Sequence, residues 1–154
     1  MSFESSETTG NSAPPVDPSD SSPVPNDEEL ADRKAILQRL RIQLLQQILA
    51  HDDGMLSVEE LTYRNPEEDE QNVRYHLREL KNRGIVEDRK VPTGKRRGDL
   101  PNTFYTVTQR GIDLLKSMNL YEEIAVWRDV YDRMERTERI ETIERMDRPT
   151  GDEH

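Results

Sequence analysis

Hydrophobic positions in the first part of the chain recur at three- and four-residue intervals, which places them on one face of a helix. They are Leu30, Leu37, Leu40, Leu44 and Ile48, with Leu45 and Leu49 widening the stripe near its end. Asn26 and Glu29 have the spacing of a capping box that begins such a helix, and Gly54 supplies the turn after it. The pattern therefore predicts one long first helix over residues 26–50.

Two shorter helices are predicted next. Ser57 and Glu60 form a second capping box, which opens a short helix with Val58 and Leu61 on its buried side. A further helix runs from about residue 70 to 83 and ends at Gly84. Its inward face is formed by Val73, Leu77 and Leu80.

After Gly84 the spacing changes from helical to extended. The segments "IVEDRKV" (85–91) and "TFYTVT" (103–108) are rich in β-branched and aromatic residues, which is typical of strands. Between them, residues 92–101 contain two prolines and two glycines around a basic tip. A helix capped by Thr108 follows. The predicted fold class is mainly α with a small β-ribbon (α+β).

The last strong pattern is a heptad seam within residues 119–147, predicted as a C-terminal amphipathic helix. The seam comprises Leu120, Ile124, Trp127, Tyr131 and Met134. It loses phase after Met134, which leaves residues 140–146 as a separate short segment. The seam either folds back on its own domain or pairs with the same helix of a second chain. The only tryptophan of the chain, Trp127, is typical of an interface anchor, so we favour a homodimer.

Composition limits the size of the core. Of 154 residues, 32% are hydrophobic and 35% are charged, which allows one small domain with soluble flanks. We assign residues 26–118 to the folded domain. Residues 1–25, rich in Ser, Pro, Asp and Glu, are expected to be a disordered acidic tail, and residues 148–154 a flexible tail.

Several classes of function are excluded or disfavoured. The chain has no cysteine, and its three histidines are not clustered, so neither a metal effector nor another cofactor is expected. No Ser-His-Asp spacing or phosphate loop marks an enzyme. No apolar run approaches the roughly 20 residues that span a bilayer, and the N-terminus lacks secretory features, so we expect no membrane association and a cytoplasmic location.

Charge is unevenly distributed along the chain. The formal net charge is −10, yet residues 71–110 contain ten basic and four acidic side chains. Arginine greatly outnumbers lysine, which together with the acidic excess indicates a proteome adapted to high salt. A basic segment in an acidic chain indicates a surface for an acidic partner.

The helix and strand at residues 72–90 carry a family pattern. Recognition helices of ArsR-type winged helix-turn-helix repressors read V-x-x-H-L-x-x-L-x-x-x-G-[IL]-V. The matching residues are Val73, His76, Leu77, Leu80, Gly84, Ile85 and Val86. Residues 104–115, "FYTVTQRGIDLL", resemble the segment by which such domains leave the wing. The chain thus resembles this family over residues 35–118, and the composition favours a haloarchaeal member without the cysteine ligands of the metal sensors.

The resemblance implies a sequence-specific DNA-binding transcriptional regulator, with the helix at about 70–83 in the major groove of double-stranded DNA. Opposite the core stripe, that helix presents Gln71, Arg74, Tyr75, Arg78 and Asn82, and Asn72 lies at the edge of this face. Arg can contact guanine in a bidentate manner, and Gln or Asn can do the same with adenine. The basic wing, residues 92–101, would place Lys95, Arg96 and Arg97 on the backbone or in the minor groove.

Two alternatives accompany this hypothesis. Winged helices also serve as protein-interaction adaptors without specific DNA binding, and the fold alone does not decide between these roles. His76 adjoins the core stripe, where a packed, hydrogen-bonded histidine is favoured over a ligand or a pH switch.

Overall fold

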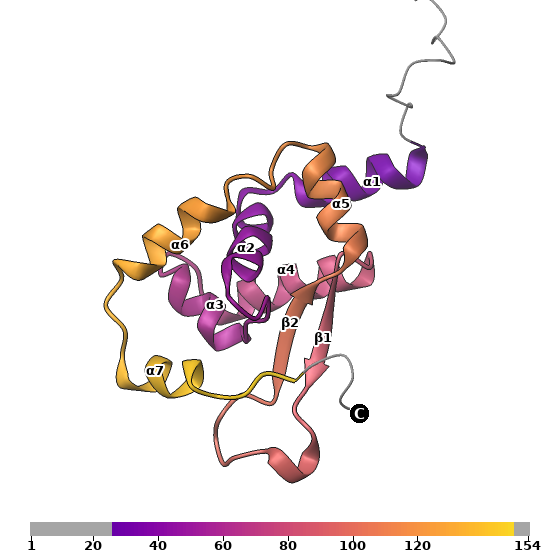
Figure 1. Cartoon of the computed structure of the whole chain (residues 1–154). Coiled ribbons are helices and arrows are strands. Elements are labelled where there is room, and N and C mark those ends of the chain that lie inside the picture. Colours follow the sequence, from indigo (N-terminus) through magenta and orange to yellow (C-terminus); the bar gives the residue numbers. More distant parts are fainter. Residues whose placement is uncertain (1–25, 150–154) are drawn as a thin grey trace, which may run out of the picture.

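The computed structural model describes residues 26–149, which form a mainly helical domain with a two-stranded antiparallel ribbon (Figure 1). The elements in chain order are α1 (Asp27–Ile36), α2 (Arg39–Ala50), α3 (Val58–Arg64), α4 (Glu70–Asn82), β1 (Val86–Lys90), a 3₁₀ turn (Thr93–Lys95), β2 (Thr103–Val107), α5 (Gln109–Ser117), α6 (Ile124–Asp132) and α7 (Glu138–Glu144). The predicted fold class is confirmed for this part of the chain, and α3, α4, β1, β2 and α5 follow in the predicted order. The tail expected at residues 1–25 lies outside the described residues.

The long first helix expected over residues 26–50 is wrong, because the chain breaks between α1 and α2. Leu37 caps α1 and is 61% exposed, and Gln38 has extended backbone angles. The break allows Ile36 and Leu40 to reach the core from two differently directed helices. The carbonyl of Ala35, left without a helical partner at the end of α1, accepts a hydrogen bond of 2.9 Å from Arg41 Nη1.

Helix α2 lies at the centre of the domain, with the other helices and the ribbon around it (Figure 1). Leu44, Leu45 and Ile48 are fully buried. Because α2 is surrounded, three of its polar residues, Arg41, Gln46 and Gln47, are buried too. Gln46 Nε2 donates to the carbonyl of Leu120 at 2.6 Å. The Gln47 side chain exchanges two hydrogen bonds with the buried amide of Asn65, directly after α3.

The helix boundaries follow the capping residues of the sequence. Ser57 and Glu60 form both hydrogen bonds of the predicted capping box at α3. Thr108 Oγ1 accepts from the backbone N–H of Gly111 and begins α5, as predicted. Gly111 allows α5 to pack closely on the ribbon, since a Cβ there would lie 2.5 Å from the carbonyl oxygen of Ile85.

The ribbon pairs β1 with β2 in the register Val86↔Val107 to Lys90↔Thr103. Leu56 adds an isolated bridge on the other side of β2, through two backbone hydrogen bonds with Tyr105 of 3.1 and 2.8 Å. This third strand segment was not predicted, because a single bridging residue leaves no alternating pattern. It attaches the ribbon to the chain that leads into α3.

The C-terminal segment forms two helices instead of one continuous amphipathic helix. Helix α6 packs on α2, and α7 packs on α3 after the chain turns near residues 133–137. Glu138 and Glu141 occupy the next seam positions, so a continuous helix would present charge to the core. By starting a new helix capped by Thr137, the chain buries Ile140 and Ile143 instead.

A buried ion pair attaches the C-terminal segment to α3. Arg148 Nη1 and Nη2 lie 2.5 and 2.8 Å from the two carboxylate oxygens of Glu60, and the guanidinium carbon lies 4.6 Å from the ring centroid of Phe104. Pro149 is buried as well. The packed part of the chain therefore continues two residues into the expected flexible tail, of which residues 150–154 lie outside the described range.

The same pair sets the charge state of Glu60. Burial raises the pKa of this carboxyl, but hydrogen bonds and positive charge from Arg148, with hydrogen bonds from Ser57, outweigh it and leave the pKa below its usual value. Because the folded-state pKa is lowered, this contribution to stability is present above the ordinary pKa of 4.5 and is lost as the pH falls through the folded value.

Glu60→Gln keeps a capping-box acceptor but leaves Arg148 buried without a counter-charge, so we expect the free energy of unfolding to fall by about 3–5 kcal/mol near neutral pH. Urea denaturation followed by tryptophan fluorescence measures this loss. Because glutamine does not titrate, the free energy of unfolding of this variant should also fall less on acidification than that of the unmodified protein. Glu59→Gln, which removes the partly exposed partner of Arg139, should cost at most about 1 kcal/mol. Equal losses in the two variants would contradict a special role for the buried pair.

Candidate nucleic-acid interface

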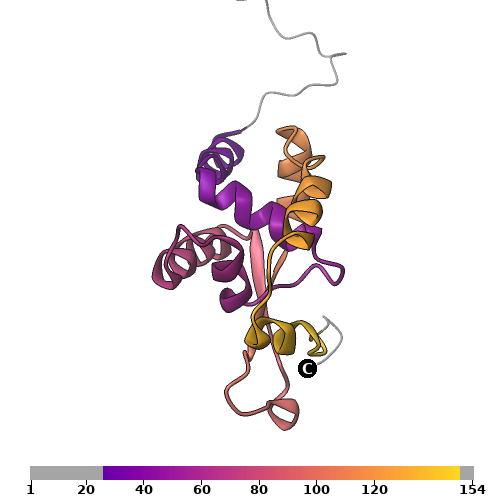
Figure 2. The same cartoon turned by 90° about the vertical axis from the view of Figure 1, so that its left-hand side faces the viewer.

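Helix α4 divides into a buried and an exposed face, as the sequence predicts. Val73, Leu77 and Leu80 are fully buried. Gln71, Arg74 and Arg78 are exposed, and Tyr75 is 44% exposed. Seen from the side, α4 lies at the left of the molecule and the ribbon extends to a tip at the bottom (Figure 2). Both predicted contact regions thus lie at the periphery of the domain.

A buried hydrogen bond connects α2 to α4. Arg41 Nε donates to His76 Nδ1 at 2.9 Å. Accepting at Nδ1 requires the neutral imidazole. Accordingly, burial lowers the pKa of His76, and the positive charge of Arg41 lowers it further. The predicted packed, hydrogen-bonded histidine is confirmed, and its partner comes from a helix 35 residues earlier in the chain.

Two of the predicted contact residues are engaged by neighbouring carboxylates. Arg74 Nη2 and Nε lie 2.7 and 3.0 Å from the same oxygen of Glu70, with both side chains more than half exposed. An exposed pair of this kind contributes at most about 1 kcal/mol, so a phosphate or base can displace it. Asn72 is partly buried and donates to Glu68 at 2.6 Å, which turns its amide toward the helix surface.

The remaining members of the face are free of acidic partners. Arg78 and Gln71 make no ion pair or side-chain hydrogen bond within the described chain. The guanidinium carbons of Arg78 and Arg41 lie 5.7 and 6.0 Å from the Tyr75 ring centroid. The ring also meets His76 edge-on at 5.1 Å between centroids. Tyr75 is thus oriented by its neighbours, and Arg78 remains available to a partner.

The wing tip presents the three predicted cations, Lys95, Arg96 and Arg97, to solvent. Arg96 Nε donates to the carbonyl of Val91 at 3.0 Å, which orients this side chain along the wing. Asp99 is the only acidic residue of residues 92–101. Its carboxylate pairs with an arginine from outside the wing.

That arginine, Arg139 of α7, connects the wing to α3. It lies 3.0 Å from Asp99 Oδ2 and forms hydrogen bonds of 2.9 and 3.1 Å with the carboxylate of Glu59. The hydrogen bonds to Glu59 and Asp99 raise the pKa of Arg139. The sequence did not predict the contacts of Arg139 with Glu59 and Asp99, or the hydrogen bond between Arg41 and His76. In each case the partners are far apart in the chain, so no local spacing relates them.

Other basic residues of the segment 71–110 are paired within the domain. Arg83 Nη1 lies 3.3 Å from the buried carboxylate of Asp32, and Arg89 lies 2.5 Å from Glu87. Arg110, on α5, forms an ion pair with the same Asp32. The charge of the segment is therefore partly structural, and the cations of the α4 face and the wing tip are those left for a partner.

The seam of α6 faces its own chain. Trp127 Nε1 donates to Gln46 Oε1 at 2.7 Å, and the guanidinium carbons of Arg64 and Arg136 lie 3.5 and 4.1 Å from the Tyr131 ring centroid. All five seam residues are partly buried in the single chain. Outside the seam, two apolar residues of α6 remain exposed: Val126 is 58% exposed and Val130 is 43% exposed.

Within residues 26–149, no helix is long and apolar enough to cross a membrane. The same part of the chain contains no group of three histidine or acidic side chains placed to hold a metal ion.

Comparison with known proteins supports the architecture. A family described as a helix-turn-helix domain matches residues 32–89. The chain is 55% identical to a Halomicrobium mukohataei protein whose structure is described as containing a GntR superfamily winged-helix-turn-helix domain. The match covers 82% of this chain and 90% of that one, with a TM-score of 0.72. Diamide-treated YodB from B. subtilis is 22% identical over 66% of this chain and 90% of its own, with a TM-score of 0.47. Among curated proteins there is no match.

Proposed function

The chain belongs to the winged helix-turn-helix family, and from this premise we propose that it is a sequence-specific DNA-binding transcriptional regulator. The family resemblance drawn from residues 72–90 is confirmed, and the haloarchaeal source of the 55% identical protein agrees with the halophilic composition. Domains of this type are typical of DNA-binding regulators and are not enzymes. We place the protein in the cytoplasm, where its DNA partner would be.

The observation that carries the proposal is a group of exposed cations on α4 and at the wing tip of a chain whose net charge is −10. On α4, Arg78 has no acidic partner among the described residues and Arg74 has only an exposed pair with Glu70. At the wing tip, Lys95, Arg96 and Arg97 are exposed. A helix fits the major groove and reads base edges there, whereas wing cations contact phosphates or the minor groove. The acidic remainder of the surface repels DNA and so restricts binding to this face.

Arg74→Ala and Arg78→Ala should each erode discrimination between a cognate and a scrambled duplex by about 1–3 kcal/mol, if the arginine contacts a base in a bidentate manner. The cognate duplex would be selected from a random pool, and affinities measured by gel shift at fixed salt. Arg133→Ala, on the exposed end of α6, serves as the matched control and should bind as the unmodified protein does. Unchanged discrimination in both α4 variants would show that this face does not read sequence.

Replacing Arg96 and Arg97 together by Gln should weaken binding to all duplexes alike, because phosphate contacts carry no sequence information. The slope of log affinity against log salt should become shallower by about 2 if each arginine neutralises one phosphate. Fluorescence anisotropy with cognate and scrambled duplexes at several KCl concentrations measures both effects. An unchanged salt slope would show that the wing does not contact the DNA. If the unmodified protein binds no DNA at all, the adaptor alternative is favoured.

The homodimer also remains a proposal. Since a winged helix reads only a short site, a dimer would read two half-sites about one helical turn apart. The predicted interface residues Leu120, Ile124, Trp127, Tyr131 and Met134 contact their own chain, so the apolar surface that α6 offers to a second copy includes Val126 and Val130.

The double variant Val126→Glu/Val130→Glu should convert a dimer to a monomer, because it buries like charges at a two-fold interface. Light scattering after size exclusion in high KCl gives the mass. Asp129→Asn, on the same exposed helix, is a control that should keep the dimer. A monomeric unmodified protein, or a double variant that stays dimeric, would contradict an interface on this face.

A further inference from the structure

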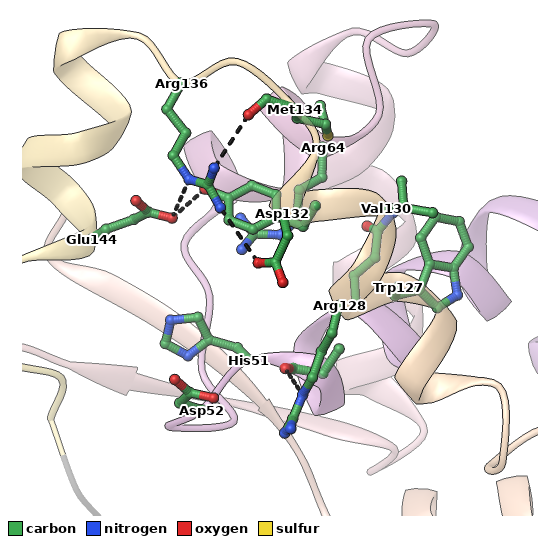
Figure 3. A pocket seen from close by; sticks show the side chains of 13 residues that line it. His51, Asp52, Arg64, Trp127, Arg128, Val130, Asp132, Met134, Arg136 and Glu144 are labelled. Carbon is green, nitrogen blue, oxygen red and sulfur yellow. Dashed lines mark hydrogen bonds and ion pairs between the residues drawn. The ribbon is translucent and has the colours of Figure 1, made fainter.

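A cavity of about 420 Å³ lies among the end of α2, the end of α3, α6 and α7 (Figure 3). Its apolar wall includes Trp127, Val130 and Met134, and the Tyr131 ring also lines it. The volume falls within the roughly 300–1,000 Å³ that is typical of small-molecule sites. Four elements from distant parts of the sequence contribute to it, so the cavity exists only in the folded domain.

Three arginines line this cavity, and only one of them is neutralised. Arg136 forms ion pairs with Glu144 at 3.4 Å and with Asp132 at 3.9 Å (Figure 3). Neither Arg64 nor Arg128 has a carboxylate within 4.0 Å among the described residues. Arg64 and Arg128 are thus two cations without a carboxylate partner that line the same cavity.

The two unneutralised arginines are held in place by groups without negative charge. Arg128 Nε donates to the carbonyl of Ala50 at 2.7 Å, which leaves the other guanidinium nitrogens free for a second partner. Arg64 stacks on the Tyr131 ring and has a long contact of 3.5 Å with the carbonyl of Glu60. These contacts orient both side chains, and neither has a carboxylate counter-ion among the described residues.

The environment of Arg64 favours an added anion. Burial lowers the pKa of Arg64, which means that its charged form lacks solvation that nothing in the chain fully replaces. A bound carboxylate would supply charge-assisted hydrogen bonds to such a group. The neighbouring acids Asp52, Asp132 and Glu144 limit the charge that the ligand can carry, because a dianion would be repelled.

We propose that this cavity binds a small organic monoanion, namely a carboxylate with a compact aromatic or aliphatic body. The carboxylate would contact Arg64 and Arg128, and the body would pack on Trp127 and Met134. Near Arg64 and Arg128, which have no carboxylate partner, a negative charge is favoured over a positive one, and an uncharged ligand would offer neither guanidinium group a counter-charge. The inference does not rest on the DNA-binding function, because ligand binding can be measured without DNA.

Trp127 is the only tryptophan and lines the cavity, so its fluorescence reports occupancy directly. The probes are benzoate and benzamide, which have similar shape and differ in charge, titrated into the full chain at constant high KCl. Benzoate should change the emission saturably, and calorimetry should give the same dissociation constant. Benzamide should bind about tenfold more weakly or worse, as expected for loss of hydrogen bonds to charged groups.

Arg64→Gln and Arg128→Gln should each weaken benzoate binding about tenfold or more. Arg133→Gln, which removes an exposed cation directly after α6 and outside the cavity, should leave benzoate binding unchanged. Because Arg128 is exposed, its variant is expected to fold even if the Arg64 variant does not. No saturable benzoate binding by either method, equal affinity for benzamide, or full affinity in the Arg128 variant would overturn the proposal.

Discussion

The domain depends on burying polar side chains in mutually satisfied pairs around α2. With only 32% hydrophobic residues, the chain lacks enough apolar side chains to surround its central helix completely. Arg41, Gln46 and Gln47 are accordingly buried on α2, and each makes hydrogen bonds to another element. A buried polar group costs about 1–3 kcal/mol when unpaired. These pairs therefore specify which helices must meet.

This constraint connects the core to the proposed DNA-binding surface. The hydrogen bond between Arg41 and His76 crosses the interior and fixes the rotation of α4, which sets the direction of the exposed face. The pairs on that face, such as Arg74 with Glu70, are solvent-exposed and weak. The helix is thus positioned by strong buried interactions, while its outer side chains can exchange their partners for DNA.

The C-terminal segment has a similar role on the other side of the domain. Arg148 and Arg139 bind the adjacent acids Glu60 and Glu59 at the start of α3, and Arg139 also binds Asp99 of the wing. The C-terminal segment thus connects α3 to the wing. Its two helices also line the cavity with the unneutralised arginines, so the segment that holds the wing also forms part of the proposed anion site.

Local patterns in the sequence were sufficient for most of the fold. Capping residues such as Ser57 and Thr108, the apolar stripe of α4 and the two β-branched segments each act over a few residues, and they determined the helices, the ribbon and the exposed side of α4. The break after Ile36 escaped prediction, because Leu37 continues the helical spacing, although Arg41 stabilises the end of α1 from the next helix. Only the tertiary structure decided which charges are free, where the α6 seam faces and that a cavity forms. The reason is physical: these features arise from pairs such as Glu60 with Arg148, whose free energy depends on burial and on contacts between residues distant in sequence.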